Sequence, residues 1–263
     1  MSFIPTSEDL LYEQKAHIGW LTLNRPQARN AMTFAMYEGI AQLCARPVEE
    51  LPKVIVITGA GDRAFAAGTD IAQFTSFTGA DDVFGYESRM SSVLQTLEAC
   101  PVPTIAAIRG ACTGGGAAIA AACDLRIGAP SALFGMPIAR TLGNCLSLDN
   151  YRRIAAIIGG TRLKEVIFRA RLVDATESRA IGWLHEVVES DEVLLPEVAR
   201  IASELSELAP LTLRATKQAI THLRDSYDEN YGRTLLTMCY LSDDFKEGVD
   251  AFLNKRSPNW LGH

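Results

Sequence analysis

The chain has 263 residues, which is enough for one domain with an extension or for two small domains. Its composition, 48% hydrophobic and 21% charged residues, is that of a globular protein and excludes disordered, collagen-like and coiled-coil classes. The net charge of −6, with no compensating cluster of lysine and arginine, makes nucleic acid an unexpected partner.

No segment has the features of a secretory signal or of a membrane span. Glu8, Asp9 and Glu13 do not fit a signal peptide, and no apolar run approaches 18 residues without a charge or a break. The six cysteines show neither C-x-x-C spacing nor zinc-ligand spacing to a histidine, so we expect buried, reduced thiols, Cys145 included, and no metal site. The expected location is the cytoplasm, without a membrane partner.

The first half of the chain alternates between strand-like and helix-like stretches. A strand is predicted at residues 18–23, with residues 10–17 as its hairpin partner, and Thr33 is expected to cap the helix that follows. Buried strands are predicted at residues 54–57, 103–108 and 125–128, a helix at 86–99, and an alanine-rich helix that runs through Ala122.

From about residue 148 the periodicity of a helix dominates. Helices are predicted at residues 151–158, 164–169, 176–181, 193–208, 211–223, 231–241 and 242–253. The sequence therefore predicts an α/β core over residues 1–195 and an all-helical region over residues 196–263, with Pro210 as a joint between core and tail.

Two glycine-containing turns are the candidates for chemistry, one at residues 64–71 and one at residues 114–116. A glycine run that enters a helix leaves N–H groups unpaired, and the helix dipole adds positive charge there. Such a place suits a phosphate or a developing oxyanion. Tight packing between a helix and a strand explains the triple glycine equally well.

Other glycine and serine motifs do not fit. No Lys-Ser/Thr follows Gly116, so the second turn is not a nucleoside-triphosphate loop. Gly59 and Gly61 lack the third glycine of a dinucleotide fingerprint, because position 64 is alanine. No G-x-S-x-G is present and no histidine lies near either turn, so a serine hydrolase is disfavoured.

A set of motifs runs in order along nearly the whole chain. They are Asn-Arg-Pro at 24–26, Asn-Ala at 30–31, Ala-Phe-Ala-Ala-Gly-Thr-Asp at 64–70, Gly-Gly-Gly at 114–116, Cys-Asp at 123–124, and the segments 172–175, 180–184 and 242–256. This ordered set resembles the crotonase (enoyl-CoA hydratase/isomerase) superfamily. The resemblance implies an α/β fold, a crotonase-type spiral of ββα units, followed by a C-terminal all-helical oligomerisation region that builds a homotrimer or homohexamer.

The resemblance also implies an acyl-CoA substrate, with coenzyme A as part of the substrate and no permanently bound cofactor. The backbone N–H groups of Thr69 and Gly115 would form an oxyanion hole for the thioester. Contacts to CoA or substrate are implied for Arg25, Arg29, Ala66, Gly68, Asp70, Ile71, Gly114, Arg140 and Lys255. Arg25 and Arg29 would lie near the CoA phosphates, and Lys255 would reach a neighbouring subunit's ligand. For each charged residue a solvated surface role stays open, and Asp70 is also suited to capping the segment after it.

The chain departs from the family at both acid–base positions. Hydratases of this family use two glutamates, and here the matching positions hold Ala118 and Ile138. Neither side chain can transfer a proton, so ordinary hydration of a 2-enoyl-CoA is expected to be very slow.

The loop of residues 139–149 holds polar residues that could replace these two glutamates, and Asn144 and Asp149 are the catalytic candidates. Asp149 is equally suited to the first turn of the next helix. Glu87 is a further candidate base, at the start of a helix that lines the acyl pocket in this family. The function expected is that of a lyase or isomerase acting on acyl-CoA, other than an ordinary hydratase; the alternative is a non-catalytic acyl-CoA-binding homologue.

Overall fold

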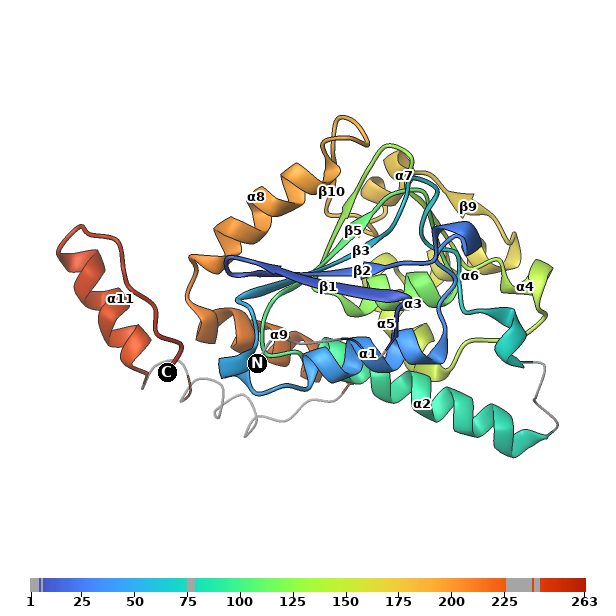
Figure 1. The fold of residues 1–263 in the computed structure, drawn as a ribbon, viewed down its shortest axis with the longest axis horizontal. Helices are drawn as coiled ribbons and strands as arrows, with labels where there is room; N and C mark the ends of the chain where they lie inside the picture. The colour runs from blue at the N-terminus through green and yellow to red at the C-terminus, as the bar shows by residue number, and fades with distance from the viewer. Residues whose placement is uncertain (1–4, 6, 75–78, 226–237, 239–241) are drawn as a thin grey trace.

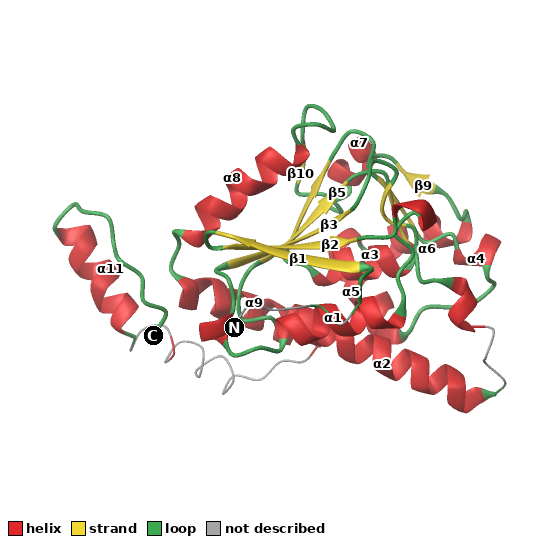
Figure 2. Cartoon of the chain, in the orientation of Figure 1, coloured by secondary structure: helices red, strands yellow, loops and turns green. Residues whose placement is uncertain are grey.

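The computed structural model describes residues 5, 7–74, 79–225, 238 and 242–263. Two β-sheets form its centre, with helices packed around them (Figures 1 and 2). The six strands of the first sheet lie in the order β1 (Leu10–Lys15), β2 (Ile18–Leu23), β3 (Val54–Gly59), β5 (Thr104–Ile108), β7 (Leu125–Gly128) and β10 (Glu186–Val187). Only the β1–β2 pair of this sheet is antiparallel, which confirms the predicted hairpin.

The second sheet has four short strands in the order β4 (Ala64–Ala66), β6 (Ala111–Thr113), β8 (Leu133–Gly135) and β9 (Leu172–Val173). Each repeat of the spiral places one strand in each sheet. Strands β3, β5 and β7 are neighbours in the first sheet, and strands β4, β6 and β8 are neighbours in the second. Helices α2 (Ala80–Glu98) and α3 (Gly115–Ala122) follow the first two of these strand pairs. The predicted spiral of ββα units is therefore confirmed.

Gly110 shows why the turns of the spiral need glycine. It connects β5 to β6 with a φ of +61°, and a Cβ on this residue would collide with the carbonyl group of Arg63. The N–H of Ala111 donates to that carbonyl, so successive turns of the spiral are hydrogen-bonded where they stack. Any larger residue at position 110 would push the two turns apart.

The remaining helices surround the sheets. They are the short 3-10 helices η1 (Pro26–Ala28), η2 (Val48–Glu50) and η3 (Ile71–Phe74), together with α1 (Phe34–Cys44), α4 (Ile138–Thr141), α5 (Leu148–Ile158), α6 (Gly160–Phe168), α7 (Ala175–Ala180), α8 (Leu194–Ser206), α9 (Pro210–Asp225) and α11 (Asp243–Leu253). The predicted helices that fall on described residues are all present. The helix predicted at residues 231–241 lies outside the described residues, with the exception of Met238. Thr33 caps α1 as predicted, because its Oγ1 accepts a hydrogen bond from the N–H of Met36.

Both faces of the first sheet are covered, which explains its continuous apolar strands. Alternate residues of β3 face opposite cores: Ile55 packs toward α1, α2 and α3, and Val54 packs toward α8. The domain boundary expected at residues 195/196 falls inside α8, and the apolar face of α8 ties the start of the helical region to the core.

Helix α2 begins six residues before the predicted start. Its first residues lie away from the core, with Val83 and Phe84 exposed, so the buried periodicity used for the prediction is missing there. Asp82 accepts a hydrogen bond from the N–H of Gly79 and so supports this earlier start. In Figure 1 this end of α2 and helix α4 lie at one end of the molecule, and α11 lies at the other. Among the described helices, none is both long and apolar enough to cross a membrane.

Candidate active site

A buried asparagine holds the first glycine turn in place. The amide nitrogen of Asn30 donates to the carbonyl groups of Ala60 and Ala64, at 2.9 and 2.7 Å. Its side-chain oxygen accepts from the N–H of Arg25 at 2.9 Å, and the residue has no exposed surface. The Asn-Arg-Pro and Asn-Ala motifs therefore position the segment that leads to Gly68, because they fasten two turns to each other.

A single parallel bridge then orients Thr69. The N–H of Met32 donates to the carbonyl group of Gly68, and the N–H of Asp70 donates to the carbonyl group of Met32, both at 2.9 Å. In a parallel bridge these flanking groups make both hydrogen bonds. The N–H of Thr69 itself therefore points away from Met32.

Gly115 brings a second N–H close to Thr69, and both residues line the same cleft. It is the first residue of α3, and a Cβ built on it would lie 3.3 Å from the nitrogen of Thr69. Gly114, with a φ of +52°, brings the helix start against Gly68. Within the described residues, neither the N–H of Thr69 nor that of Gly115 donates a hydrogen bond to another protein group. The pair is available to an acceptor brought by a ligand, at the positive end of α3.

These groups border a cleft of about 190 Å³. Of the residues singled out in the sequence, it is lined by Gly68, Thr69, Ile71, Glu87, Gly114, Gly115, Ala118, Ile138, Asn144 and Cys145. Ala118 and Ile138, where the resemblance led us to expect the glutamates of a hydratase, contribute a methyl group and an aliphatic side chain to this cleft. Cys145 is exposed, so the expectation that it is buried was wrong; it lies in the loop after α4 rather than in a helix or strand.

Two tyrosines that the sequence analysis missed also line the cleft. The hydroxyl group of Thr69 lies 2.9 Å from that of Tyr37 and 3.5 Å from that of Tyr86. Burial raises the pKa of both tyrosines and so keeps them protonated. Tyr86 packs edge-on against Phe74, with ring centroids 5.0 Å apart. No local motif marks either tyrosine, because each comes from a helix whose residues are far from the glycine turns in the sequence.

Glu87 is the sole carboxylic acid among the described residues that line the cleft. Burial raises the pKa of Glu87 from the ordinary value of a glutamic acid. In the described part of the chain no hydrogen bond or ion pair holds its carboxylate. No set of three or more histidine, cysteine, aspartate or glutamate residues is placed there to bind a metal ion.

A larger cavity of about 750 Å³ adjoins the cleft, and we call it the apolar chamber. The side chains of Ile71, Val83, Phe84 and Leu142 line it, and all four are exposed. Glu87 and the loop of residues 142–147 line both the cleft and the chamber. Such an apolar, solvent-open surface next to a polar cleft is typical of a binding site for a partly apolar ligand.

Seven predicted site residues lie outside the lining of the cleft: Asp149, Arg140, Ala66, Lys255, Arg25, Arg29 and Asp70. Asp149 stands in the first turn of α5, where its carboxylate accepts from Arg152 at 2.9 Å, so the structure favours the helix-start alternative over a catalytic role. Arg140 lies exposed on α4, and Ala66 is fully buried in β4. Lys255 follows α11, at the end of the molecule opposite α4 (Figure 1).

The two arginines predicted to lie near the CoA phosphates differ in whether an acidic side chain already pairs with them. Arg25 and Asp70 form an ion pair with each other at 2.9 Å, and Arg25 also donates to the carbonyl group of Ala31. Arg29 is exposed, and no ion pair engages it within the described ranges. Its carbonyl group accepts from the N–H of Ala67, so its backbone lies beside the segment that leads into the cleft.

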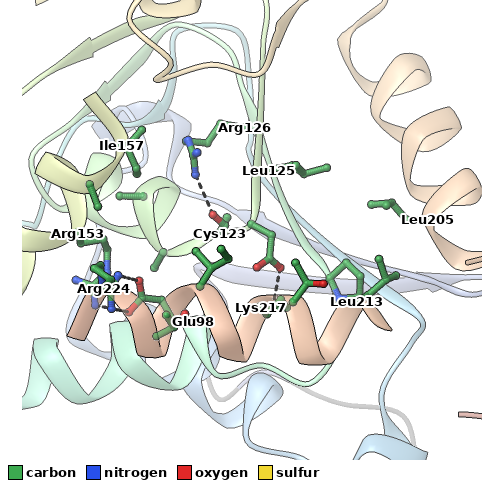
Figure 3. Close-up of a pocket in the computed structure, with 18 residues that line it drawn as sticks. Glu98, Cys123, Leu125, Arg126, Arg153, Ile157, Leu205, Leu213, Lys217 and Arg224 are labelled. Atoms are coloured by element: carbon green, nitrogen blue, oxygen red, sulfur yellow. Dashed lines mark hydrogen bonds and ion pairs between the residues drawn. The ribbon is translucent and has the colours of Figure 1, made fainter. Parts of the chain in front are cut away.

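A separate cavity of about 440 Å³ lies between α9 and the end of α3 (Figure 3). Its acidic side chains are already paired: Glu98 with Arg153 and Arg224, and Asp124 with Lys217. These contacts fasten α9 to the core. The cleft at Thr69 and Gly115, with its unpaired N–H groups, is therefore the better candidate for an active site.

Comparison with known proteins identifies the family of this chain. Residues 13–263 match the family model for enoyl-CoA hydratase/isomerase. Crotonyl-CoA hydratase of Syntrophomonas wolfei is 31% identical over 97% of this chain and 98% of its own length, and short-chain-enoyl-CoA hydratase of Clostridium acetobutylicum is 30% identical over 94% and 95%. The crystal structure of an enoyl-CoA hydratase/carnithine racemase from Magnetospirillum magneticum superposes with a TM-score of 0.87, at 32% identity, over 98% of this chain and 97% of that one. The chain belongs to the enoyl-CoA hydratase/isomerase family, the crotonase superfamily.

Proposed function

We propose that this protein is an acyl-CoA enzyme that polarises a thioester carbonyl between the N–H groups of Thr69 and Gly115. The observation that carries the proposal is that the N–H groups of two neighbouring residues of the cleft lining donate to no protein group in the described part of the chain. A thioester oxygen that accepts from both would gain charge as an enolate forms, and preorganised donors stabilise that charge. Each such donor contributes on the order of 10²–10³ in rate.

The surroundings of the cleft suit the two ends of an acyl-CoA. The apolar chamber would take the acyl chain, since its lining is largely aliphatic and aromatic. Arg29 is the arginine better placed for a CoA phosphate, because Arg25 is already neutralised by Asp70. Coenzyme A would enter as part of the substrate, with no resident cofactor.

Ordinary hydration is not the proposed reaction. Adding water to a double bond requires one group that deprotonates water and one that protonates the α-carbon. Ala118 and Ile138 can do neither, although the Syntrophomonas relative is named a crotonyl-CoA hydratase. We expect turnover of crotonyl-CoA to lie well below typical enzyme values of ~1–10³ per second.

A matched pair of glycine variants tests the oxyanion site. Gly115→Ala adds a methyl carbon that would lie 3.3 Å from the Thr69 nitrogen and would collide with the hydroxyl groups of Tyr37 and Thr69, so the contact between the two turns must shift. Gly160→Ala adds the same methyl group at the first residue of α6, with nothing within 4 Å. The readout is the incorporation of deuterium at the α-carbon of butyryl-CoA and octanoyl-CoA in D2O, followed by mass spectrometry. We expect exchange with the wild type and with Gly160→Ala, and a loss of at least about 10²-fold with Gly115→Ala.

The alternative, a non-catalytic acyl-CoA-binding protein, gives a different result. It predicts binding of both thioesters by calorimetry without any exchange in the wild-type protein. Rapid hydration of crotonyl-CoA by the wild type would instead contradict our interpretation of Ala118 and Ile138.

A further inference from the structure

The cleft contains few groups that can move a proton. Its described titratable side chains are those of Tyr37, Tyr86, Glu87 and Cys145. The two tyrosine hydroxyls already lie in a chain through Thr69, and their burial opposes loss of the proton. A carboxylate is a far better base near neutral pH than a phenol, whose ordinary pKa is about 10.

Glu87 is placed where an acyl chain would pass. It follows Tyr86, whose hydroxyl group lies 3.5 Å from that of Thr69, so the second turn of α2 is held against the oxyanion site. The side chain of Glu87 lines the cleft and the apolar chamber alike. An acyl group with its carbonyl at Thr69 and its tail in the chamber would therefore cross in front of this carboxylate.

We propose that Glu87 is the proton-transferring residue of this cleft and that the reaction it serves is an isomerisation of an acyl-CoA; this inference rests on the proposed function. The Glu87 carboxylate takes a proton from the α-carbon, so that the C–H bond breaks and an O–H bond forms. The electron pair moves onto the thioester oxygen, which accepts from the N–H groups of Thr69 and Gly115. The resulting carboxylic acid returns a proton to the same carbon or to a conjugated one, so no co-reactant is needed.

A single carboxyl group restricts the class of reaction. One group can remove a proton from the α-carbon and return it to a conjugated carbon on the same face, which shifts a double bond. Hydration requires a second group that activates water, and within the described lining of the cleft there is no second carboxylate. Tyr86 can assist as a hydrogen-bond donor, because burial favours its protonated form.

The test compares Glu87→Gln with Glu38→Gln in the deuterium-exchange assay with octanoyl-CoA. Glu38 lies on α1, exposed and paired with Arg89 at 3.6 Å, outside the cleft. We expect exchange to fall by about 10²–10⁴-fold in Glu87→Gln and to stay within about twofold in Glu38→Gln. Binding of octanoyl-CoA by calorimetry should persist in both, and Glu87→Asp, which keeps a carboxylate, should retain more exchange than Glu87→Gln.

The outcomes separate this inference from the proposed function. If Glu87→Gln is folded, binds octanoyl-CoA and exchanges as fast as the wild type, Glu87 is not the base, while the oxyanion site stands. If the wild type binds the thioester but never exchanges, the proposed function and the role of Glu87 both fail. Should Glu87→Gln fail to fold, Glu87→Asp takes its place. A folded Glu87→Asp that binds octanoyl-CoA but exchanges more slowly than the Glu38→Gln control supports Glu87, because its carboxylate is withdrawn by one methylene group. Exchange equal to that of the control contradicts the role of Glu87.

Discussion

At position 69 the backbone and the side chain have separate tasks. The N–H lies in the cleft because the bridge with Met32 uses the groups on either side of it. The hydroxyl group instead bonds to Tyr37, which is nearly fully buried. In the proposed function the backbone N–H would polarise the thioester, whereas the side chain of Thr69 contributes to packing around it.

A truncation separates these two tasks. Thr69→Ala keeps the N–H and removes the partner of the Tyr37 hydroxyl, which costs on the order of 1 kcal/mol of stability. We expect α-proton exchange into octanoyl-CoA to fall by less than about tenfold, far less than in Gly115→Ala. A loss as large as that of Gly115→Ala would show that the hydroxyl group acts on the substrate directly.

Among elements, α9 depends on buried charge for its attachment. Glu98, at the end of α2, accepts from Arg153 of α5 and from Arg224 of α9 (Figure 3). Arg153 is 2% exposed and Glu98 is 9% exposed, so removing the carboxylate would leave a buried cation without its partner. Breaking a buried pair in this way costs about 3–5 kcal/mol.

The prediction is that Glu98→Gln lowers the free energy of unfolding by about 3 kcal/mol or more, as measured by urea denaturation. The control is Glu204→Gln, which breaks an exposed pair with Arg200 on α8 and should cost no more than about 0.5 kcal/mol. Equal effects of the two variants would contradict the role of Glu98 in holding α9.

The same pair gives a pH dependence. Burial alone would raise the pKa of Glu98, but hydrogen bonds from Arg153 and Arg224 outweigh it and lower the pKa. A carboxylate with a lowered pKa in the folded state stabilises the protein above its unfolded pKa of about 4.3 and loses this contribution as the pH falls through the folded value. Acidification below about pH 4 should therefore destabilise the wild type more steeply than Glu98→Gln.

How far the sequence predicts each element depends on its burial. The strands 54–57, 103–108 and 125–128 were found because they are buried on both faces, and the helices because their apolar faces repeat. The strands of the second sheet were missed because they have two or three residues, too few for a pattern. The glycine turns of the site could be predicted, whereas Tyr37 could not, since its contact with Thr69 arises only from packing of α1.

At the scale of the whole molecule, the cleft and the last helix lie far apart. Helix α4, beside the cleft, and α11 lie at opposite ends of the molecule in Figure 1. Lys255, which follows α11, is therefore remote from the cleft of its own chain. Large apolar side chains are also exposed, among them Leu148 at 85% and Phe168 at 80%. Both features fit an assembly in which copies of the chain cover each other's surfaces.

The last prediction concerns this assembly. The family resemblance implies a homotrimer or homohexamer, so light scattering should give three or six times the mass of the chain. If Lys255 then reaches the ligand of a neighbouring subunit, Lys255→Ala should weaken binding of octanoyl-CoA about two- to fivefold at low salt and less at high salt, because an exposed charge contact is worth up to about 1 kcal/mol and is screened by ions. Lys246→Ala, which removes a lysine paired with Asp243 on the same helix, is the matched control and should not change binding. A monomeric mass would exclude any contact of Lys255 with the cleft, because α11 and the cleft lie at opposite ends of the folded molecule.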